Sequence, residues 1–102
     1  MQEGLKQAVM VPLNAARQSF RALKLSETVI KHGIPASLTD AGVGAQMAYS
    51  GVIGNIYNVL VNLKDIKDNS FVEDIKKRCI AVKADAAAAY QNAINLIESK
   101  LN

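Results

Sequence analysis

The sequence contains no tryptophan, one cysteine and one histidine, and aromatic residues make up only 5% of its 102 residues. A lone cysteine excludes an intrachain disulfide framework and is typical of a reducing compartment. One cysteine and one histidine are also too few for a zinc site, so we predict no metal centre. The apolar residues are mostly alanine, leucine, isoleucine and valine, which favours closely packed helices over a β-sandwich.

The sequence also lacks a strong excess of either basic or acidic residues. The formal net charge is +3, and the basic residues are interspersed with acidic ones, so nucleic-acid binding has little support. The N-terminal residues 1–9 lack the basic start and the apolar core of a signal peptide. The lone cysteine and the lack of a signal peptide are together consistent with a reducing compartment.

No charged residue occurs between Asp40 and Lys64, a run of 23 residues. A run of this length raises the alternative of a transmembrane helix. Lipid disfavours strongly polar side chains, however, and the run contains five of them: Gln46, Ser50, Asn55, Asn58 and Asn62. We therefore expect a helix that is buried among other helices and does not span a membrane.

Helical spacing within this run defines two lines of residues. The first line is apolar and consists of Val52, Ile56, Val59 and Leu63. The second line begins with small residues and continues with amide side chains: Gly44, Ala48, Gly51, Asn55, Asn58 and Asn62. Glycine weakens a helix by about 1 kcal/mol relative to alanine, but it is tolerable where a backbone or a ligand must come close. We predict a central helix over residues 40–66, with Thr39 or Asp40 as its N-cap.

The asparagines of the second line require hydrogen-bond partners. A buried amide without a partner costs about 1–3 kcal/mol, so the row predicts a polar neighbour along its length. Periodicity alone favours hydrogen bonds between helices, within a bundle or across a dimer. A cleft in which the amides face a polar ligand is the alternative.

The flanking segments have the same helical rhythm. We predict a first helix over 2–32, kinked near Pro12 because proline lacks the backbone donor, and ended by Gly33 and Pro35. The Ser-x-x-Glu pattern of residues 70–73 is typical of a capping box and predicts a third helix over 70–101. Cys79 lies on the apolar face of this helix, which favours a buried, inert thiol. The fold class is thus an all-α bundle of three long helices in one domain, 1–102, whose uncovered surface predicts a homo-oligomer.

None of these residues forms a recognisable catalytic motif. His32 lies at the predicted end of the first helix, where a capping role is sufficient. The glycines of the central run neither follow a strand nor precede Lys-Ser/Thr, so they are not a phosphate loop. The residues alone predict a helical bundle and no reaction.

Three strings, however, carry a family resemblance: GLKQAVMVPLNAA, SLTDAGVGA and GVIGNIYNVLVNLKD. They resemble the cyclodeaminase domain of formiminotransferase-cyclodeaminase and the related bacterial methenyltetrahydrofolate cyclohydrolases. The most specific parts are A-V-x-V-P-L at residues 8–13, S-x-[ST]-D at 37–40 and N-V-x-x-N-L-K-D at 58–65. The likeness extends over essentially the whole chain. Family domains also have upstream helices and a Gly-rich P-G-G-G-S segment, so the chain is similar to the C-terminal part of such a domain.

The resemblance implies an oligomeric cytoplasmic domain that acts on one-carbon tetrahydrofolates, without a bound cofactor. A cyclodeaminase closes formiminotetrahydrofolate and expels ammonia, a lyase reaction of histidine degradation, whereas a cyclohydrolase opens the methenyl ring with water. Both reactions need proton transfer and stabilisation of charge. The implied roles are acid–base chemistry or cation stabilisation for Asp40, and substrate binding for Ser37, Asn58, Asn62 and Lys64.

Two features leave a non-catalytic alternative open. Family members have an asparagine after the glycine that corresponds to Gly33, where this chain has Ile34, and this removes one ligand contact. Without the Gly-rich segment, the chain alone is expected to be inactive unless that segment joins it as a partner. The alternative is a helical oligomerisation module in which the asparagine row forms an interface.

Overall fold

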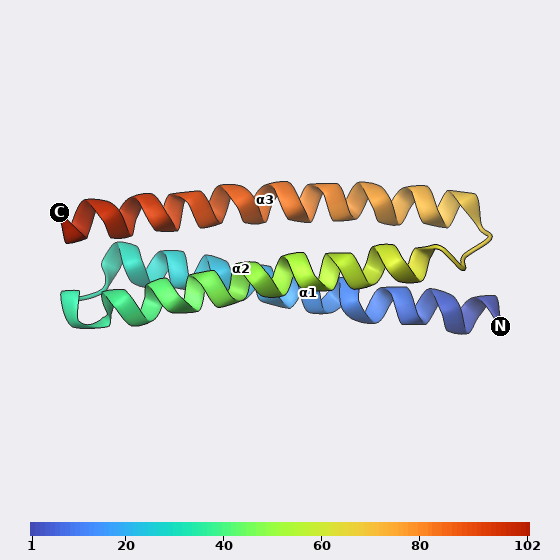
Figure 1. The fold of residues 1–102 in the computed structure, drawn as a ribbon, viewed down its shortest axis with the longest axis horizontal. Coiled ribbons are helices and arrows are strands. Elements are labelled where there is room, and N and C mark those ends of the chain that lie inside the picture. The colour runs from blue at the N-terminus through green and yellow to red at the C-terminus, as the bar shows by residue number, and fades with distance from the viewer.

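The computed structural model describes residues 1–102 and consists of three long helices that run up, down and up (Figure 1). The helices are α1 (Gln2–His32), α2 (Pro35–Leu63) and α3 (Asn69–Leu101). The molecule measures 53 × 18 × 16 Å, so its length is close to that of α3 alone at about 1.5 Å per residue. The all-α prediction and the number of helices are confirmed. No helix is long and apolar enough to cross a membrane.

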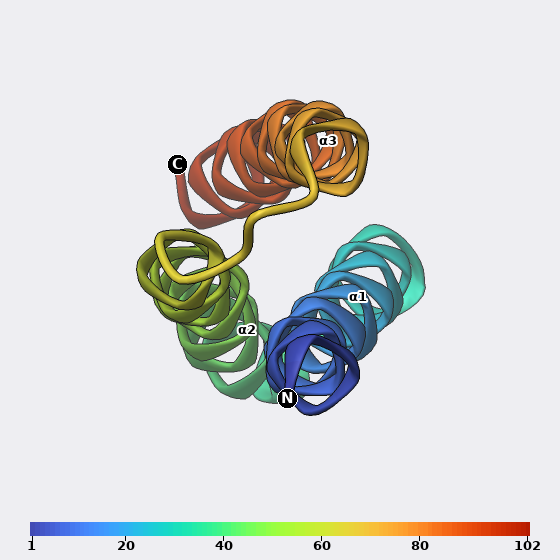
Figure 2. The ribbon, with the colours of Figure 1, turned by 90° about the vertical axis from the view of Figure 1, so that its right-hand side faces the viewer.

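Seventeen buried residues from all three helices and the α2–α3 connection form one apolar core. Figure 2 shows the three helices end-on. The predicted apolar line of the central helix is part of this core, since Val52, Ile56, Val59 and Leu63 are at most 4% exposed. Alanines line much of the α3 side, where Ala86, Ala89 and Ala93 let the helices approach closely. No polar or charged residue is fully buried.

The start of α2 differs from the prediction. The helix begins at Pro35, five residues before Asp40, and Ile34 is its N-cap without a side-chain cap. Proline is favoured in the first turn of a helix, because the N–H that it lacks has no helical partner there. Pro35 therefore starts α2, and the predicted cap role of Thr39 and Asp40 was wrong. The helix also ends at Leu63, three residues earlier than predicted.

The start of α3 was predicted to within one residue, but its cap was not. Asp68 is the N-cap, and its Oδ1 accepts a hydrogen bond from the backbone N–H of Phe71 at 3.1 Å. The predicted capping box at residues 70–73 therefore lies inside the helix. Asp68 outcompetes Ser70 because it is the residue with extended backbone next to the free amides.

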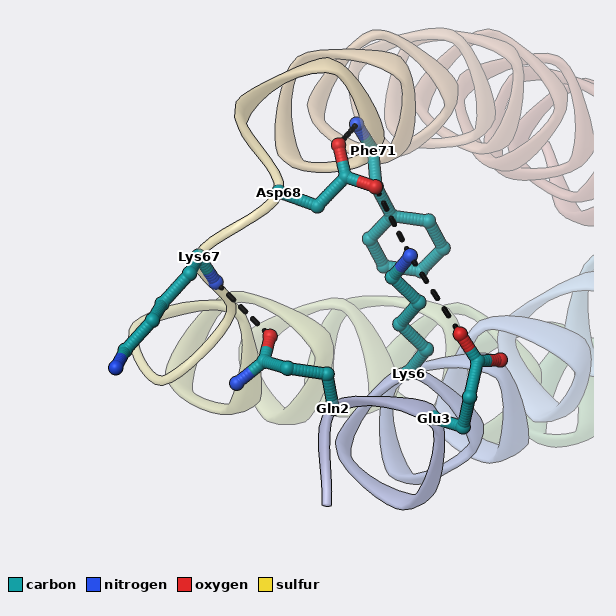
Figure 3. A network of polar contacts seen from close by, with 6 residues as sticks. All are labelled: Gln2, Glu3, Lys6, Lys67, Asp68 and Phe71. Carbon is teal, nitrogen blue, oxygen red and sulfur yellow. Dashed lines mark hydrogen bonds and ion pairs between the residues drawn. The ribbon is translucent and has the colours of Figure 1, made fainter.

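Polar contacts join the N-terminus of α1 to the α2–α3 connection (Figure 3). Lys6 Nζ lies 2.9 Å from Asp68 Oδ2 and 5.2 Å from the centre of the Phe71 ring. The Gln2 side chain accepts from the backbone N–H of Lys67 at 3.1 Å. The hydrogen bond from Lys6 is the main cause that lowers the pKa of Asp68, and the same bond raises the pKa of Lys6.

A lysine closes the other end of the bundle. Lys100 Nζ, from the last turn of α3, donates to the carbonyl oxygens of Ile30 and Lys31 at 2.6 and 2.9 Å. Carbonyls in the last turn of a helix have no helical donor, so the cation takes its place. His32, for which the sequence suggested a capping role, is exposed and makes no such bond.

Two of the predicted close approaches occur between α1 and α2. A Cβ added to Gly51 would lie 2.7 Å from Ser19 Oγ, and one added to Gly44 would lie 3.4 Å from Ser26 Oγ. The missing side chain at Gly51 thus lets α1 pack tightly on this part of α2, whereas a methyl group at Gly44 would make an ordinary contact with α1. Gly54 differs, because a Cβ there would meet nothing within 4 Å.

Candidate functional site

Two of the predicted site residues share one groove between α1 and α2. Ser37 and Asp40, from the first turns of α2, line it together with residues of both helices: Leu25, Ser26, Val29, Ala41 and Gly44. The groove has a volume of about 330 Å³ and is open to solvent. Its walls are apolar or small, so Asp40 supplies its only charge.

Asp40 has no structural role that the chain reveals. It lies in the interior of α2, its side chain is exposed, and its carboxylate makes no hydrogen bond or ion pair within the chain. Aspartate is also a poor residue for a helix interior. Since the cap explanation fails, this position offers a bound molecule an exposed carboxylate without a partner in the chain.

Ser37 makes a hydrogen bond in the first turn of α2. Its Oγ donates to the carbonyl oxygen of Ile34 at 3.0 Å. Gly33 leaves room for this turn, because a Cβ there would collide with the carbonyl oxygen of Val29 and would lie 3.1 Å from Ser37 Oγ. Ser37 therefore helps to hold the α1–α2 connection, and its hydroxyl remains at the edge of the groove.

The other predicted site residues are not part of this groove. Asn58, Asn62 and Lys64 lie 18 to 24 positions after Asp40 on the same helix and its C-cap, or about 27–36 Å away at the helical rise. Asn58 and Lys64 are exposed, and neither makes a side-chain hydrogen bond within the chain. A single copy of the chain thus brings Ser37 and Asp40 together and leaves the remaining three residues at the opposite end.

Asn62 has a clear structural partner. Its Nδ2 donates to the carbonyl oxygen of Ala8 at 3.1 Å, across the α1–α2 contact. Ala8 lies four positions before Pro12, so its carbonyl is the one that the proline leaves without a helical donor. α1 nevertheless continues through Pro12 as one helix. The Asn62 amide thus replaces the bond that Pro12 cannot make.

Within one copy of the chain, the asparagine row has no common partner. Asn55 Nδ2 donates to the carbonyl of Gly51 in its own helix at 2.8 Å, Asn62 bonds to α1, and Asn58 faces solvent. Hydrogen bonding between helices of one bundle, which periodicity favoured, is confirmed for Asn62, while bonds across a dimer or to a ligand stay predictions.

The α1 side of the groove was not anticipated. Leu25 and Val29, which line the groove, are 66% and 40% exposed. Periodicity does not assign Leu25 clearly to the buried or the exposed face of α1. The only sequence signal for the groove was Gly44, a small residue that lines it beside Ser26.

A second groove lies between α2 and α3. Ile56, Leu60 and Ile80 form its apolar walls, Lys76 and Lys83 stand at its edge, and its volume is about 270 Å³. Cys79 reaches it but is only 3% exposed, and burial raises the pKa of its thiol. The predicted burial of Cys79 is confirmed, and a buried thiol with a raised pKa is expected to be a poor nucleophile.

Comparison with known proteins identifies a family. The family model described as formiminotransferase-cyclodeaminase matches residues 1–81. This match contains the groove residues Ser37 and Asp40 and all three predicted site residues at the far end of α2.

Individual relatives match over nearly the whole chain. A methenyltetrahydrofolate cyclohydrolase of Methylorubrum extorquens is 34% identical over 102 residues, which are 100% of this chain and 49% of the relative. A formimidoyltransferase-cyclodeaminase of Rattus norvegicus is 32% identical over 100 residues, 98% of this chain and 18% of the relative. The corresponding protein of Dictyostelium discoideum is 29% identical over 98 residues. The chain thus spans about half the length of the cyclohydrolase and less than a fifth of the larger proteins.

Proposed function

We propose, from the premise that this chain belongs to the formiminotransferase-cyclodeaminase family, that it is the C-terminal part of an enzyme domain that acts on one-carbon derivatives of tetrahydrofolate. Relatives whose names state a cyclohydrolase or a cyclodeaminase support this substrate class. Residues 1–102 form a single helical domain in this proposal, which the upstream Gly-rich segment of the family completes. The enzyme is cytoplasmic and homo-oligomeric, and it needs no metal or bound cofactor.

Asp40 carries the chemistry in this proposal. Its unpaired carboxylate in the α1–α2 groove is the single observation that supports the role most directly. Cyclohydrolase and cyclodeaminase reactions both move protons at folate nitrogens while positive charge is spread over a one-carbon unit. A carboxylate can accept such a proton and can stabilise the adjacent cation.

The remaining residues bind the substrate. Ser37 offers a hydroxyl beside Asp40, and the apolar groove walls suit the flat faces of a pterin. Asn58 and Lys64 lie about 27–36 Å from Asp40 in one copy. In this proposal they therefore serve the Asp40 site of another copy in the homo-oligomer, where Asn58 orients polar groups of the folate and Lys64 meets one of its carboxylates. Asn62 contributes mainly by position, because its amide already holds α1 at Ala8.

Substituting Asp40 by asparagine tests the proposal. We expect Asp40→Asn to leave the free energy of unfolding within about 0.5 kcal/mol of wild type, because the side chain is exposed and unpaired. In the domain rebuilt with its upstream segment, the variant is expected to lose turnover of methenyltetrahydrofolate by on the order of 100-fold. The decrease in methenyltetrahydrofolate absorbance measures this rate.

Asp85→Asn is the matched control, since Asp85 is an exposed aspartate in the interior of α3. It should retain full turnover. If Asp40→Asn were equally active, Asp40 would not be the acid–base group. Release of ammonia from formiminotetrahydrofolate by the rebuilt domain would indicate the lyase activity of histidine degradation. Hydrolysis of methenyltetrahydrofolate without ammonia release would indicate the cyclohydrolase.

The second candidate is a non-catalytic helical module, favoured by the exposed apolar residues of α2. A rebuilt domain that neither binds nor converts a folate, yet assembles into oligomers, would support this function. Titration with methenyltetrahydrofolate, followed by fluorescence, distinguishes the two before any kinetics are attempted.

A further inference from the structure

One face of α2 remains uncovered along the whole uncharged run. Six exposed residues follow one another at alternating steps of four and three: Val43, Met47, Ser50, Gly54, Tyr57 and Val61. The four large members expose 56–70% of their surface. Alternating steps of four and three keep residues on one seam of a helix, the spacing with which two helices pack against each other. We call this set the α2 seam.

Gly54 has no explanation within a single copy. It is exposed in the interior of α2, and a side chain there would meet nothing within 4 Å. Glycine in a helix interior costs about 1 kcal/mol relative to alanine. Gly44 and Gly51 face α1, whereas Gly54 leaves room only for something outside the chain. A second helix backbone is the object that such a gap admits.

The α2 seam is complementary to itself when it is reversed about Val52. Val43 and Val61 are each nine positions from Val52, Met47 and Tyr57 are each five, and Ser50 and Gly54 are each two. An antiparallel pair with its two-fold axis at Val52 would therefore place large residues opposite large ones at the ends and small opposite small at the centre. Two copies could approach most closely where the small residues meet.

The charges continue the same symmetry. Asp40 and Lys64 are each twelve positions from Val52, and each lies three positions beyond the end of the α2 seam, in its rhythm. Both residues are exposed, and neither forms an ion pair within the chain. An antiparallel pair would place opposite charges together at both ends, whereas a parallel pair would place like charges together.

We propose that two copies of this chain pair through the α2 seam in antiparallel orientation, with Asp40 of each copy against Lys64 of the partner subunit. The observations on the α2 seam support this pairing independently of any substrate. Its consequence for the enzyme rests on the proposed function: the pairing brings to the Asp40 groove a lysine that lies about 36 Å away in the same chain. Each folate site would then be built from both copies.

Charge reversal tests the orientation. In the antiparallel pair, Asp40→Lys sets like charges together at both ends, and Lys64→Asp does the same. Each single variant should raise the dimer dissociation constant on the order of 10-fold at low salt. The double variant, with both changes, should restore the wild-type value. Sedimentation equilibrium measures these constants, and the differences should shrink at high salt.

Substitutions of two glycines, Gly54 and Gly4, test whether the α2 seam is the interface between the copies. Gly54→Arg adds a long side chain in the middle of the α2 seam and should abolish the dimer, while circular dichroism should show the helical content unchanged. Gly4→Arg is the matched control, because a side chain at Gly4 in α1 also meets nothing within 4 Å. It should dimerise as wild type does.

A wild-type chain that is monomeric at micromolar concentration would overturn the pairing, and so would a dimer that tolerates Gly54→Arg. A double charge variant as weak as the single ones would refute the antiparallel orientation. None of these measurements includes a folate. Asp40→Asn also removes one charge of the pairing, so its turnover is measured at a protein concentration at which sedimentation shows that variant to be dimeric. Failure of the pairing is then distinguishable from failure of the proposed enzyme.

Discussion

The hydrogen bond between Asn62 and Ala8 makes a quantitative prediction about coupling between two helices. Pro12 cannot donate to the Ala8 carbonyl, and Asn62 Nδ2 donates to it instead at 3.1 Å. Removing the amide with Asn62→Ala leaves this carbonyl to solvent alone. A typical hydrogen bond contributes about 0.5–1.5 kcal/mol net, so we expect a loss of about 1 kcal/mol and a fall in Tm of about 4–8 °C.

The coupling to Pro12 is the specific part of the prediction. Pro12→Ala gives α1 a backbone N–H at that position and relieves an interior proline, whose helix cost is about 3 kcal/mol. Part of this gain is lost because Pro12 is buried and its ring packs in the core. In the Pro12→Ala background the Ala8 carbonyl has its own helical donor. Asn62→Ala should then cost close to nothing, which gives a coupling free energy of about 1 kcal/mol.

Urea unfolding of the four chains, followed by circular dichroism at one fixed protein concentration, measures this coupling. Asn58→Ala is the control, since Asn58 is exposed on the same helix and makes no hydrogen bond. Its effect should stay within about 0.5 kcal/mol in both backgrounds. If Asn62→Ala cost the same with and without Pro12, Asn62 would not be replacing the bond that the proline removes.

Two further predictions concern pH and thiol reactivity. The hydrogen bond from Lys6 lowers the pKa of Asp68, so this carboxylate contributes stability that is complete above the ordinary carboxyl pKa and is lost as the pH falls through the lowered folded value. Asp68→Asn retains a cap for Phe71 but not the charge, and its destabilisation, measured by urea unfolding, should therefore disappear in acid; a constant difference at all pH values would contradict this. Burial raises the pKa of Cys79, so the native chain should react with iodoacetamide far more slowly than the urea-unfolded chain, and equal rates would contradict its burial.

Periodicity located the three helices because each buries one apolar face over many turns. The Val52–Leu63 line was predictable, since repeated three- and four-residue steps are a property of the sequence itself. The start of α2 was not, because Pro35 is compatible with two outcomes. Proline ends a helix when it follows one and begins a helix when it occupies the first turn, and only the packing of Leu38 in the core selects the second outcome.

The candidate site was predictable only in part, for a reason of distance. Family-like strings suggested Ser37, Asp40 and Lys64 as site residues, but the strings give no indication that a straight helix separates Asp40 from Lys64 by about 36 Å. The structure also shows that the Asn62 amide bonds to α1. Sequence spacing does not reveal this, because the partner of an amide depends on which carbonyl lies nearby. Spacing along a helix predicts which residues share a face and cannot predict what that face meets.

The glycines of α2 have the same appearance in the sequence but different neighbours in the structure. In sequence, Gly44, Gly51 and Gly54 look alike, as small residues in a helix that lacks charge. In the folded chain, Gly44 and Gly51 face serines of α1, and Gly54 faces empty space. All three weaken the helix by a similar amount, so the absence of a neighbour at Gly54 leaves a cost without a compensating contact in one copy. An antiparallel second copy supplies that contact and, through the same symmetry, pairs Asp40 with Lys64 of the partner subunit. One register of one helix thus accounts for an unexplained glycine and for two unpaired charges.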